Sequence, residues 1–183
     1  LSLRIVDIDP LYTLGDLARQ RMQTIAQLRE DGVFDLNREL GIPEVPQRIA
    51  VVSSPQAAGY QDFMKELRAS PYRFDVTLFG AVMQGHGAET SIIGALDAVA
   101  DRAEEFDAAV IIRGGGSQSD LSFLNSYLLS FHIAQFPLPV IAGLGHDKDQ
   151  SVVDMVAALS LKTPTAVAAF LADRAAGFDA RLE

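Results

Sequence analysis

Short apolar runs alternate with helix-like stretches through most of this chain. The runs cover residues 49–53, 74–79, 108–112 and 139–142, and the one over residues 74–79 also contains Asp75 and Thr77. Helix-start residues or helical spacing of apolar residues follow each of these runs. Strands that alternate with helices form parallel sheets through right-handed crossovers, and strands buried on both faces are apolar throughout. The pattern predicts an α/β fold with a mostly parallel sheet of at least four strands and helices on both faces.

Capping and turn residues mark where the helices of this region are expected to begin. The first predicted helix starts at Ser54-Pro55 and buries Tyr60, Phe63, Met64 and Leu67, and the second follows Gly85-His86-Gly87. A third covers residues 120–135, with Leu121, Leu124, Leu128 and Phe131 inward, and a short fourth covers residues 151–158, with Ser151 and Asp154 as a capping box. The last starts at Thr163-Pro164 and runs through residue 181 to the chain end.

The first 47 residues follow a different pattern. Residues 2–9 alternate apolar and polar side chains, which predicts a half-buried antiparallel strand that Pro10 ends. A single strand is not a stable unit, so we expect it to complete a β domain whose remainder lies outside this sequence. A helix is predicted over residues 14–31, followed by a connector. The first residue is Leu rather than Met, which indicates a piece of a longer protein.

Composition narrows the class of protein. The 183 residues include no cysteine, which excludes disulfides and thiolate metal sites. The absence of cysteine also fits a cytoplasmic location, which we predict. No apolar run approaches the length needed to span a bilayer, so no membrane partner is expected. The formal net charge of −9 argues against a broad basic surface that binds nucleic acid by itself. A polyanionic substrate would have to be held by local Arg and Lys side chains or by parts of the protein outside this sequence.

A glycine turn follows the third apolar run. Arg113 comes first, and Gly114, Gly115, Gly116 and Ser117 come directly after it. Glycines allow a phosphate to approach the backbone, a helix N-terminus presents unpaired N–H groups, and a guanidinium donates hydrogen bonds in pairs. The turn therefore favours binding of a phosphate or another oxyanion, although a tight turn beside a surface arginine explains the same residues. It matches neither the P-loop nor the G-x-G-x-x-G pattern.

His146 follows the fourth apolar run, with Asp147 and Asp149 beside it. A histidine near two carboxylates suits general acid–base catalysis or a single metal ion. A surface histidine among solvated charges is the alternative. Ligands of open parallel sheets bind outside the carboxyl ends of the strands. We therefore expect His146 and Arg113 to lie at the same edge of the sheet.

The other polar candidates have structural interpretations when each is taken alone. Asp62 lies on the polar edge of its predicted helix, which is typical of a solvated carboxylate. The remaining ones are Asp154, Ser117 and Ser119 as helix caps, His132 in an amphipathic helix, and His86 between two glycines without a supporting cluster.

Several segments together resemble the large subunit of exodeoxyribonuclease VII, a bacterial nuclease that degrades single-stranded DNA. The resemblance covers essentially the whole chain, and its most specific part is the pair Arg-Gly-Gly-Gly-Ser and Gly-His-x-x-Asp at this separation. The matching segments are Arg48-Ile-Ala-Val-Val-Ser-Ser-Pro55, the Gln84-Gly85 turn, Arg113-Gly-Gly-Gly-Ser117 with Asp120-Leu121, Gly145-His146-x-x-Asp149 and Thr163-Pro-Thr165.

The resemblance implies a domain organisation. Residues 1–12 would be the last strand of an OB-fold, residues 13–47 a helix and connector, residues 48–164 the catalytic α/β domain, and residues 165–183 the start of a long C-terminal helix. Single-stranded DNA and the small subunit of exodeoxyribonuclease VII would be the partners. The oligomeric state of the chain stays open, a homo-oligomer included.

The resemblance also implies site residues. The catalytic residues would be Asp62, Arg113, His146 and Asp149, with residues 114–117 at the phosphate. Asp62 and Asp149 would either orient the histidine and the attacking water or hold one Mg²⁺. Three positions depart from the family pattern, and none of them is one of these catalytic residues. This chain has Ile112 where the family usually has glycine, Asp147 where it has glutamate and Ser119 where it has an acidic residue.

The function implied is hydrolysis of phosphodiester bonds in single-stranded DNA. Two alternatives come from other classes: a non-catalytic module that binds a phosphate or nucleotide in the same cleft, and an assembly platform for small subunits. The chain alone is expected to bind DNA weakly, more weakly as salt rises, and to have little nuclease activity, because an OB-fold would supply the stacking and basic contacts.

Overall fold

The computed structural model describes residues 10–114, 121–145 and 150–182. The predicted strand over residues 2–9 therefore lies outside the described residues. In chain order the elements are α1 (Pro10–Glu30), α2 (Leu36–Glu39), β1 (Arg48–Ser53), α3 (Ala58–Ala69), β2 (Asp75–Gly80), α4 (Ala88–Ala100), a 3-10 turn (Ala103–Glu105), β3 (Ala108–Ile112), a second 3-10 turn (Ser122–Asn125), α5 (Tyr127–Ala134), β4 (Val140–Gly143), α6 (Val152–Val156), β5 (Leu159–Ser160) and α7 (Pro164–Asp179).

The described strands form one sheet in which every neighbouring pair is parallel, in the order β2-β1-β3-β4-β5. Strand β3 lies at the centre, with Val51 of β1 opposite Val110 on one side and Ile141 of β4 opposite Val110 on the other. All five residues of β3 are buried. The parallel sheet predicted from the apolar runs is confirmed, and β5 is a further strand of two residues.

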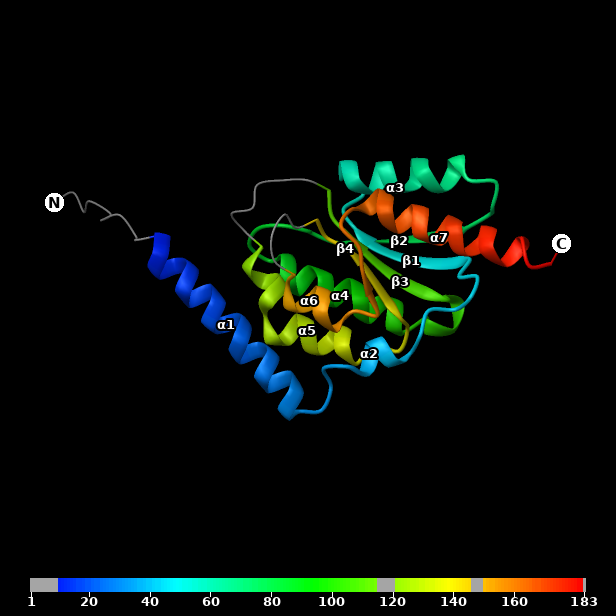
Figure 1. Cartoon of the computed structure of the whole chain (residues 1–183). Coiled ribbons are helices and arrows are strands. Elements are labelled where there is room, and N and C mark those ends of the chain that lie inside the picture. The colour runs from blue at the N-terminus through cyan, green and yellow to red at the C-terminus, as the bar shows by residue number, and fades with distance from the viewer. Residues whose placement is uncertain (1–9, 115–120, 146–149, 183) are drawn as a thin grey trace.

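Helices cover both faces of the sheet, as predicted, in three layers (Figure 1). Alternate strand residues point to opposite faces, because successive side chains of a strand alternate. Ile49 and Val51 pack in one apolar cluster with the buried side chains of α3 and α7. Ala50 and Val52 pack in the other cluster with those of α4, α5 and α6. The core is thus divided into two halves by the sheet.

Helix α1 begins at Pro10, four residues earlier than predicted. Its C-terminal half is anchored to the domain: Leu28 is fully buried, and the Thr24 hydroxyl donates to the Asn125 carbonyl at 3.0 Å. Its N-terminal half extends away from the sheet (Figure 1), and Leu14 in this half is exposed. None of the described helices is both long and apolar enough to cross a membrane.

Three helix predictions were wrong in detail. Helix α3 begins at Ala58, not at Pro55, and its N-cap Ala57 makes no side-chain cap hydrogen bond. The helix predicted over residues 120–135 is interrupted at Ser126, whose hydroxyl caps α5 by accepting from the Leu129 N–H. This break turns Leu128 outward, where it is 52% exposed. Helix α7 ends at Asp179 rather than running to the chain end.

Two predicted helix starts are confirmed. The Ser151 hydroxyl accepts from the Asp154 N–H while the Asp154 carboxylate accepts from the Ser151 N–H, a complete capping box for α6. Thr163 caps α7, and Pro164 occupies its first turn. Both helix starts were recognisable in the sequence because the capping residue has a side chain that accepts a hydrogen bond.

Candidate functional site

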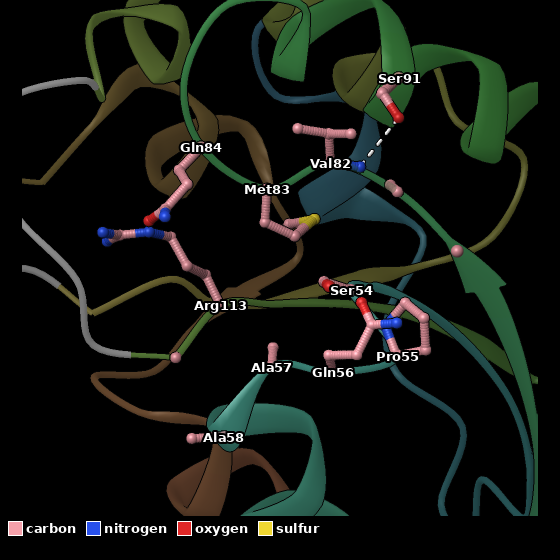
Figure 2. A pocket seen from close by; sticks show the side chains of 13 residues that line it. Ser54, Pro55, Gln56, Ala57, Ala58, Val82, Met83, Gln84, Ser91 and Arg113 are labelled. Atoms are coloured by element: carbon pink, nitrogen blue, oxygen red, sulfur yellow. Dashed lines mark hydrogen bonds between the residues drawn. The ribbon is translucent and has the colours of Figure 1, made fainter.

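A cleft of about 630 Å³ opens at the carboxyl ends of β1, β2 and β3. The turn after β1, the loop after β2 and the end of β3 form its walls (Figure 2). Its lining residues are Ser54, Pro55, Gln56, Ala57, Ala58, Gly80, Ala81, Val82, Met83, Gln84, Ser91, Arg113 and Gly114. The volume is within the range of ordinary ligand sites.

The strand order explains why the cleft lies here. From β1 the chain crosses to β2 on one side of the sheet, and the later strands are added on the other side. Helices α3 and α4, which follow β1 and β2, therefore pack on opposite faces. Their loops diverge at this point and leave a crevice at the topological switch, where open α/β sheets bind ligands. The described residues thus form a cleft at the sheet edge where Arg113 was expected to lie.

Arg113 is the charged group of the described cleft lining. Its side chain is only 6% exposed, and neither Nε nor Nη2 has a hydrogen-bond partner among the described residues. Burial lowers the pKa of the guanidinium, yet an arginine remains protonated in proteins. Buried guanidinium nitrogens that lack acceptors are costly, so the two without a partner among the described residues favour an anionic ligand that supplies acceptor oxygens.

Backbone contacts on both sides hold Arg113 in place. Its N–H donates to the Gly143 carbonyl of β4 at 3.2 Å. The carbonyl of the preceding Ile112 accepts a hydrogen bond from the buried Ser53 hydroxyl of β1 at 2.9 Å. The guanidinium therefore projects from a strand end fixed to both neighbouring strands, which is the preorganisation an anion site requires.

The N-terminus of α3 forms the wall beside Arg113. Ala57 and Ala58 line the cleft, and no side chain caps the helix. The first N–H groups of a helix have no intrahelical acceptor and carry a partial positive charge. Gly59 brings this turn close to Gly114, since a Cβ on Gly59 would lie 2.6 Å from the Gly114 Cα. The helix N-terminus and the arginine thus face the same space.

The loop after β2 forms the opposite wall. Gly85 and Gly87 adopt φ of +80° and +85°, in the left-handed region that favours glycine. Gln84 precedes them, and Figure 2 shows its side-chain amide pointing toward the Arg113 guanidinium at one end of the cleft. The sequence indicated a turn at Gln84-Gly85 but assigned no role to the glutamine. Only the fold brings this loop to Arg113.

The structure places the other predicted residues as follows. Asp62 is exposed on α3, next to the buried Phe63, and it does not line the cleft. His146, Asp149, Gly115, Gly116 and Ser117 lie outside the described residues. The described residues just before His146 follow the end of β4. Strand β4 pairs with β3, and Gly143 lies opposite Ile112. Within the described ranges no three His, Asp or Glu side chains form a metal-binding group.

Of the residues given structural interpretations, Asp154, His132 and His86 lie in the described part of the chain, whereas Ser117 and Ser119 lie outside it. Asp154 is buried in its capping box and also accepts from the Ser160 hydroxyl at 2.7 Å. The His132 Nδ1 lies 2.9 Å from the Leu128 carbonyl one turn earlier in α5. His86 is exposed and lines a separate hollow with Ser122 and Phe123. None of these three lines the cleft that contains Arg113.

A comparison with known protein families shows which family the chain belongs to. The family described as "Exonuclease VII, large subunit" matches residues 33–183. The chain belongs to this family. Exonuclease VII large subunits with similar sequences include those of Deinococcus radiodurans, 39% identical over 176 residues, and of Cyanothece sp., 37% identical over 154 residues. Another, from Lactobacillus helveticus, is 35% identical over 168 residues.

These exonuclease VII relatives are much longer than the chain. The alignments cover 93%, 84% and 90% of this chain, and 42%, 36% and 38% of the Deinococcus, Cyanothece and Lactobacillus proteins. The resemblance seen in the glycine turn and the histidine loop is thereby confirmed as membership of the exonuclease VII large-subunit family.

Proposed function

We propose that the cleft hydrolyses phosphodiester bonds of single-stranded DNA, as part of an exodeoxyribonuclease VII large subunit. The observation that carries the proposal is Arg113, a buried guanidinium whose Nε and Nη2 have no described partner, at the mouth of a strand-end cleft. A phosphodiester supplies one negative charge and two non-bridging oxygens, which match a guanidinium in pairs. The relatives' name, exodeoxyribonuclease 7 large subunit, supports the same chemistry.

The proposed roles follow from the chemistry of each group. Arg113 and the first N–H groups of α3 hold the non-bridging oxygens and stabilise the charge that develops as water attacks phosphorus. His146 accepts the proton of the attacking water or donates one to the leaving oxygen when the P–O bond breaks. Asp62 and Asp149 orient the histidine and the water, or supply oxygen ligands to one Mg²⁺.

The fit to Mg²⁺ rests on the donor set, because carboxylate oxygens are the ligands this ion prefers. Asp62 presents an exposed carboxylate in the second turn of α3. A bound Mg²⁺ would supply charge neutralisation at the phosphate. The roles of Arg113 and His146 are the same with or without the ion.

The rest of the DNA strand must be held by other parts of the protein. The chain carries a net charge of −9, and the described cleft lining contains one charged side chain and no aromatic ring on which a base could stack. We therefore propose that the longer protein supplies strand binding and that a small subunit joins it. The protein would act in the cytoplasm.

The test measures acid-soluble nucleotide release from labelled single-stranded DNA by the full-length protein with its small subunit. Asp62→Ala and His146→Ala are compared with wild type in Mg²⁺ and in EDTA. Asp97→Ala is the matched control, because Asp97 is an exposed helical aspartate of α4 that does not line the cleft. The proposal predicts loss of activity in the first two variants only. Full activity of both would favour a binding module or an assembly platform.

A further inference from the structure

We propose that Gln84 is a further substrate-contacting residue, whose side-chain amide binds the same phosphate as Arg113 from the opposite wall of the cleft. The inference rests on the proposed function and deepens it. Gln84 and Arg113 come from different loops, 29 positions apart in the chain, and both line the cleft. In Figure 2 their polar groups point toward one another at one end of the cleft, while the other side chains drawn lie farther along it.

The loop that carries Gln84 is fixed on both sides. The Ala81 N–H donates to the Ser53 carbonyl at 2.9 Å, which continues the pairing of β2 with β1. The Val82 N–H donates to the Ser91 hydroxyl of α4 at 2.9 Å. After Gln84, the Ala88 N–H donates back to the Gly85 carbonyl at 3.2 Å. A side chain on an anchored loop loses little freedom when it binds a ligand, which favours a positioning contact.

The chemistry of the amide suits this position. The Gln84 side chain is exposed and makes no hydrogen bond to a described residue. Its NH₂ group can donate to a phosphate oxygen, and its carbonyl can accept from a guanidinium or a water molecule. Because the amide is neutral, it does not compete with the phosphate for Arg113. A carboxylate at the same position would form an ion pair with Arg113 and repel the phosphate.

The remaining lining gives the bound nucleotide an orientation. Beyond the Arg113–Gln84 end, the walls carry Pro55, Val82 and Met83, whose side chains are apolar. Val82 is exposed although it is apolar. A deoxyribose or a base edge can pack on this wall without hydrogen-bond readout. The geometry therefore points to a sugar–phosphate unit bound by its phosphate at one end, independently of base identity.

The test uses the full-length protein with its small subunit and measures kcat/KM for degradation of single-stranded DNA. The variants are Gln84→Ala and Gln84→Glu, and the control is Gln135→Ala, an exposed glutamine after α5 that does not line the cleft. Loss of one hydrogen bond to a charged oxygen should lower kcat/KM by about 10- to 100-fold in Gln84→Ala. Gln84→Glu should lower it further, and Gln135→Ala should leave it unchanged.

Thermal unfolding of each variant verifies that the fold is intact, and Gln84→Glu is close enough in shape to keep it. Gln84→Ala or Gln84→Glu with the kcat/KM of wild type would overturn the inference. Arg113→Ala, run in parallel, separates the two proposals. If Arg113→Ala is inactive while both Gln84 variants retain wild-type activity, the site stands and the role of Gln84 fails. If Arg113→Ala is fully active, the proposed function fails as well.

Discussion

The backbones of Gly59 and Gly114 are in close contact at the wall of the cleft, and neither position has room for a side chain. A Cβ on Gly59 would lie 2.6 Å from the Gly114 Cα, and a Cβ on Gly114 would lie 2.7 Å from the Gly59 amide nitrogen. The contact presses the first turn of α3 against the end of β3. It thereby sets the distance between the helix N-terminus and the Arg113 guanidinium.

Gly114→Ala should impair the site while sparing the fold. The added methyl group forces the turn after β3 or the start of α3 to shift, and a displacement of about 1 Å at a preorganised site costs on the order of 100-fold in rate. Gly94→Ala is the matched control, because nothing lies within 4 Å of a Cβ at this helical position. Nucleotide release from single-stranded DNA measures the effect. Equal activities of the two variants would show that the close contact does not matter.

Replacing Arg113 with methionine should make the domain more stable. The buried guanidinium makes no described hydrogen bond through Nε or Nη2, and an apolar side chain of similar length avoids the cost of burying that charge. We expect an increase of about 1 kcal/mol in the free energy of unfolding, measured in urea. Destabilisation by Arg113→Met would mean that the arginine has a structural partner.

Asn37 connects three parts of the domain that are distant in sequence. Its buried amide donates to the carbonyls of Phe136 and Leu138, at 3.2 and 2.8 Å, and its Oδ1 accepts from the N–H groups of Val140 and Ala158, at 2.9 and 3.0 Å. Asn37→Ala leaves these groups unpaired and should cost about 3 kcal/mol in the free energy of unfolding. Asn125→Ala, which removes one acceptor from the Val152 N–H, should cost less. A smaller effect for Asn37→Ala than for Asn125→Ala would contradict this account.

Asp107 should make stability depend on acid pH. Burial raises the pKa of this carboxyl, but hydrogen bonds from the Arg48 side chain and from the N–H groups of Arg48 and Gln47 outweigh it and hold the pKa below its ordinary value. A carboxyl with a depressed pKa stabilises the fold above its unfolded pKa of about 3.9, and this contribution disappears as pH falls through the folded pKa.

Asp107→Asn should therefore lower the free energy of unfolding at pH 7, by about 1 kcal/mol because solvent screens the pair. The difference from wild type should shrink as pH falls below about 4, where the wild-type carboxyl is itself protonated. Urea unfolding at pH 7, 5 and 3 measures it. A difference that stays constant over this range would show that charge on Asp107 is not the cause.

The sequence predicted β1, β3 and β4 well because each is a short apolar run, typical of parallel strands buried on both faces. Strand β2 was also predicted, although Asp75 and Thr77 interrupt its apolar residues and it lies at the edge of the sheet. Helix starts were predictable where a side chain caps the helix, as at Ser151 and Thr163. The start of α3 was not, since its N-cap is an alanine that makes no cap hydrogen bond. The break at Ser126 was missed because apolar residues continue on both sides of it. Strand β5, with two residues, is too short to leave a periodic pattern.

The site was predictable only in part, for a physical reason. Arg113 is recognisable because it directly follows a buried strand, and strand ends of parallel sheets meet at one edge. The alternation of strands and helices along the sequence does not determine the order of the strands in the sheet. The position of the loop after β2, opposite Arg113, was therefore not predictable. Gln84 reaches the cleft through that order, whereas Ser54 was recognisable because it directly follows a predicted strand. The role of Asp62, which is exposed and outside the cleft lining, stays a prediction from the family resemblance.

The central claim is that Arg113 binds the phosphate whose ester bond is broken. The most direct measurement is the rate of nucleotide release from single-stranded DNA by the full-length protein with its small subunit, comparing Arg113→Ala with Arg68→Ala. Arg68 is an exposed arginine of α3 that does not line the cleft. We expect Arg113→Ala to lose about 100- to 1,000-fold in kcat, as for loss of a donor to a developing charge, while Arg68→Ala keeps its rate. Equal rates for the two variants would contradict the claim.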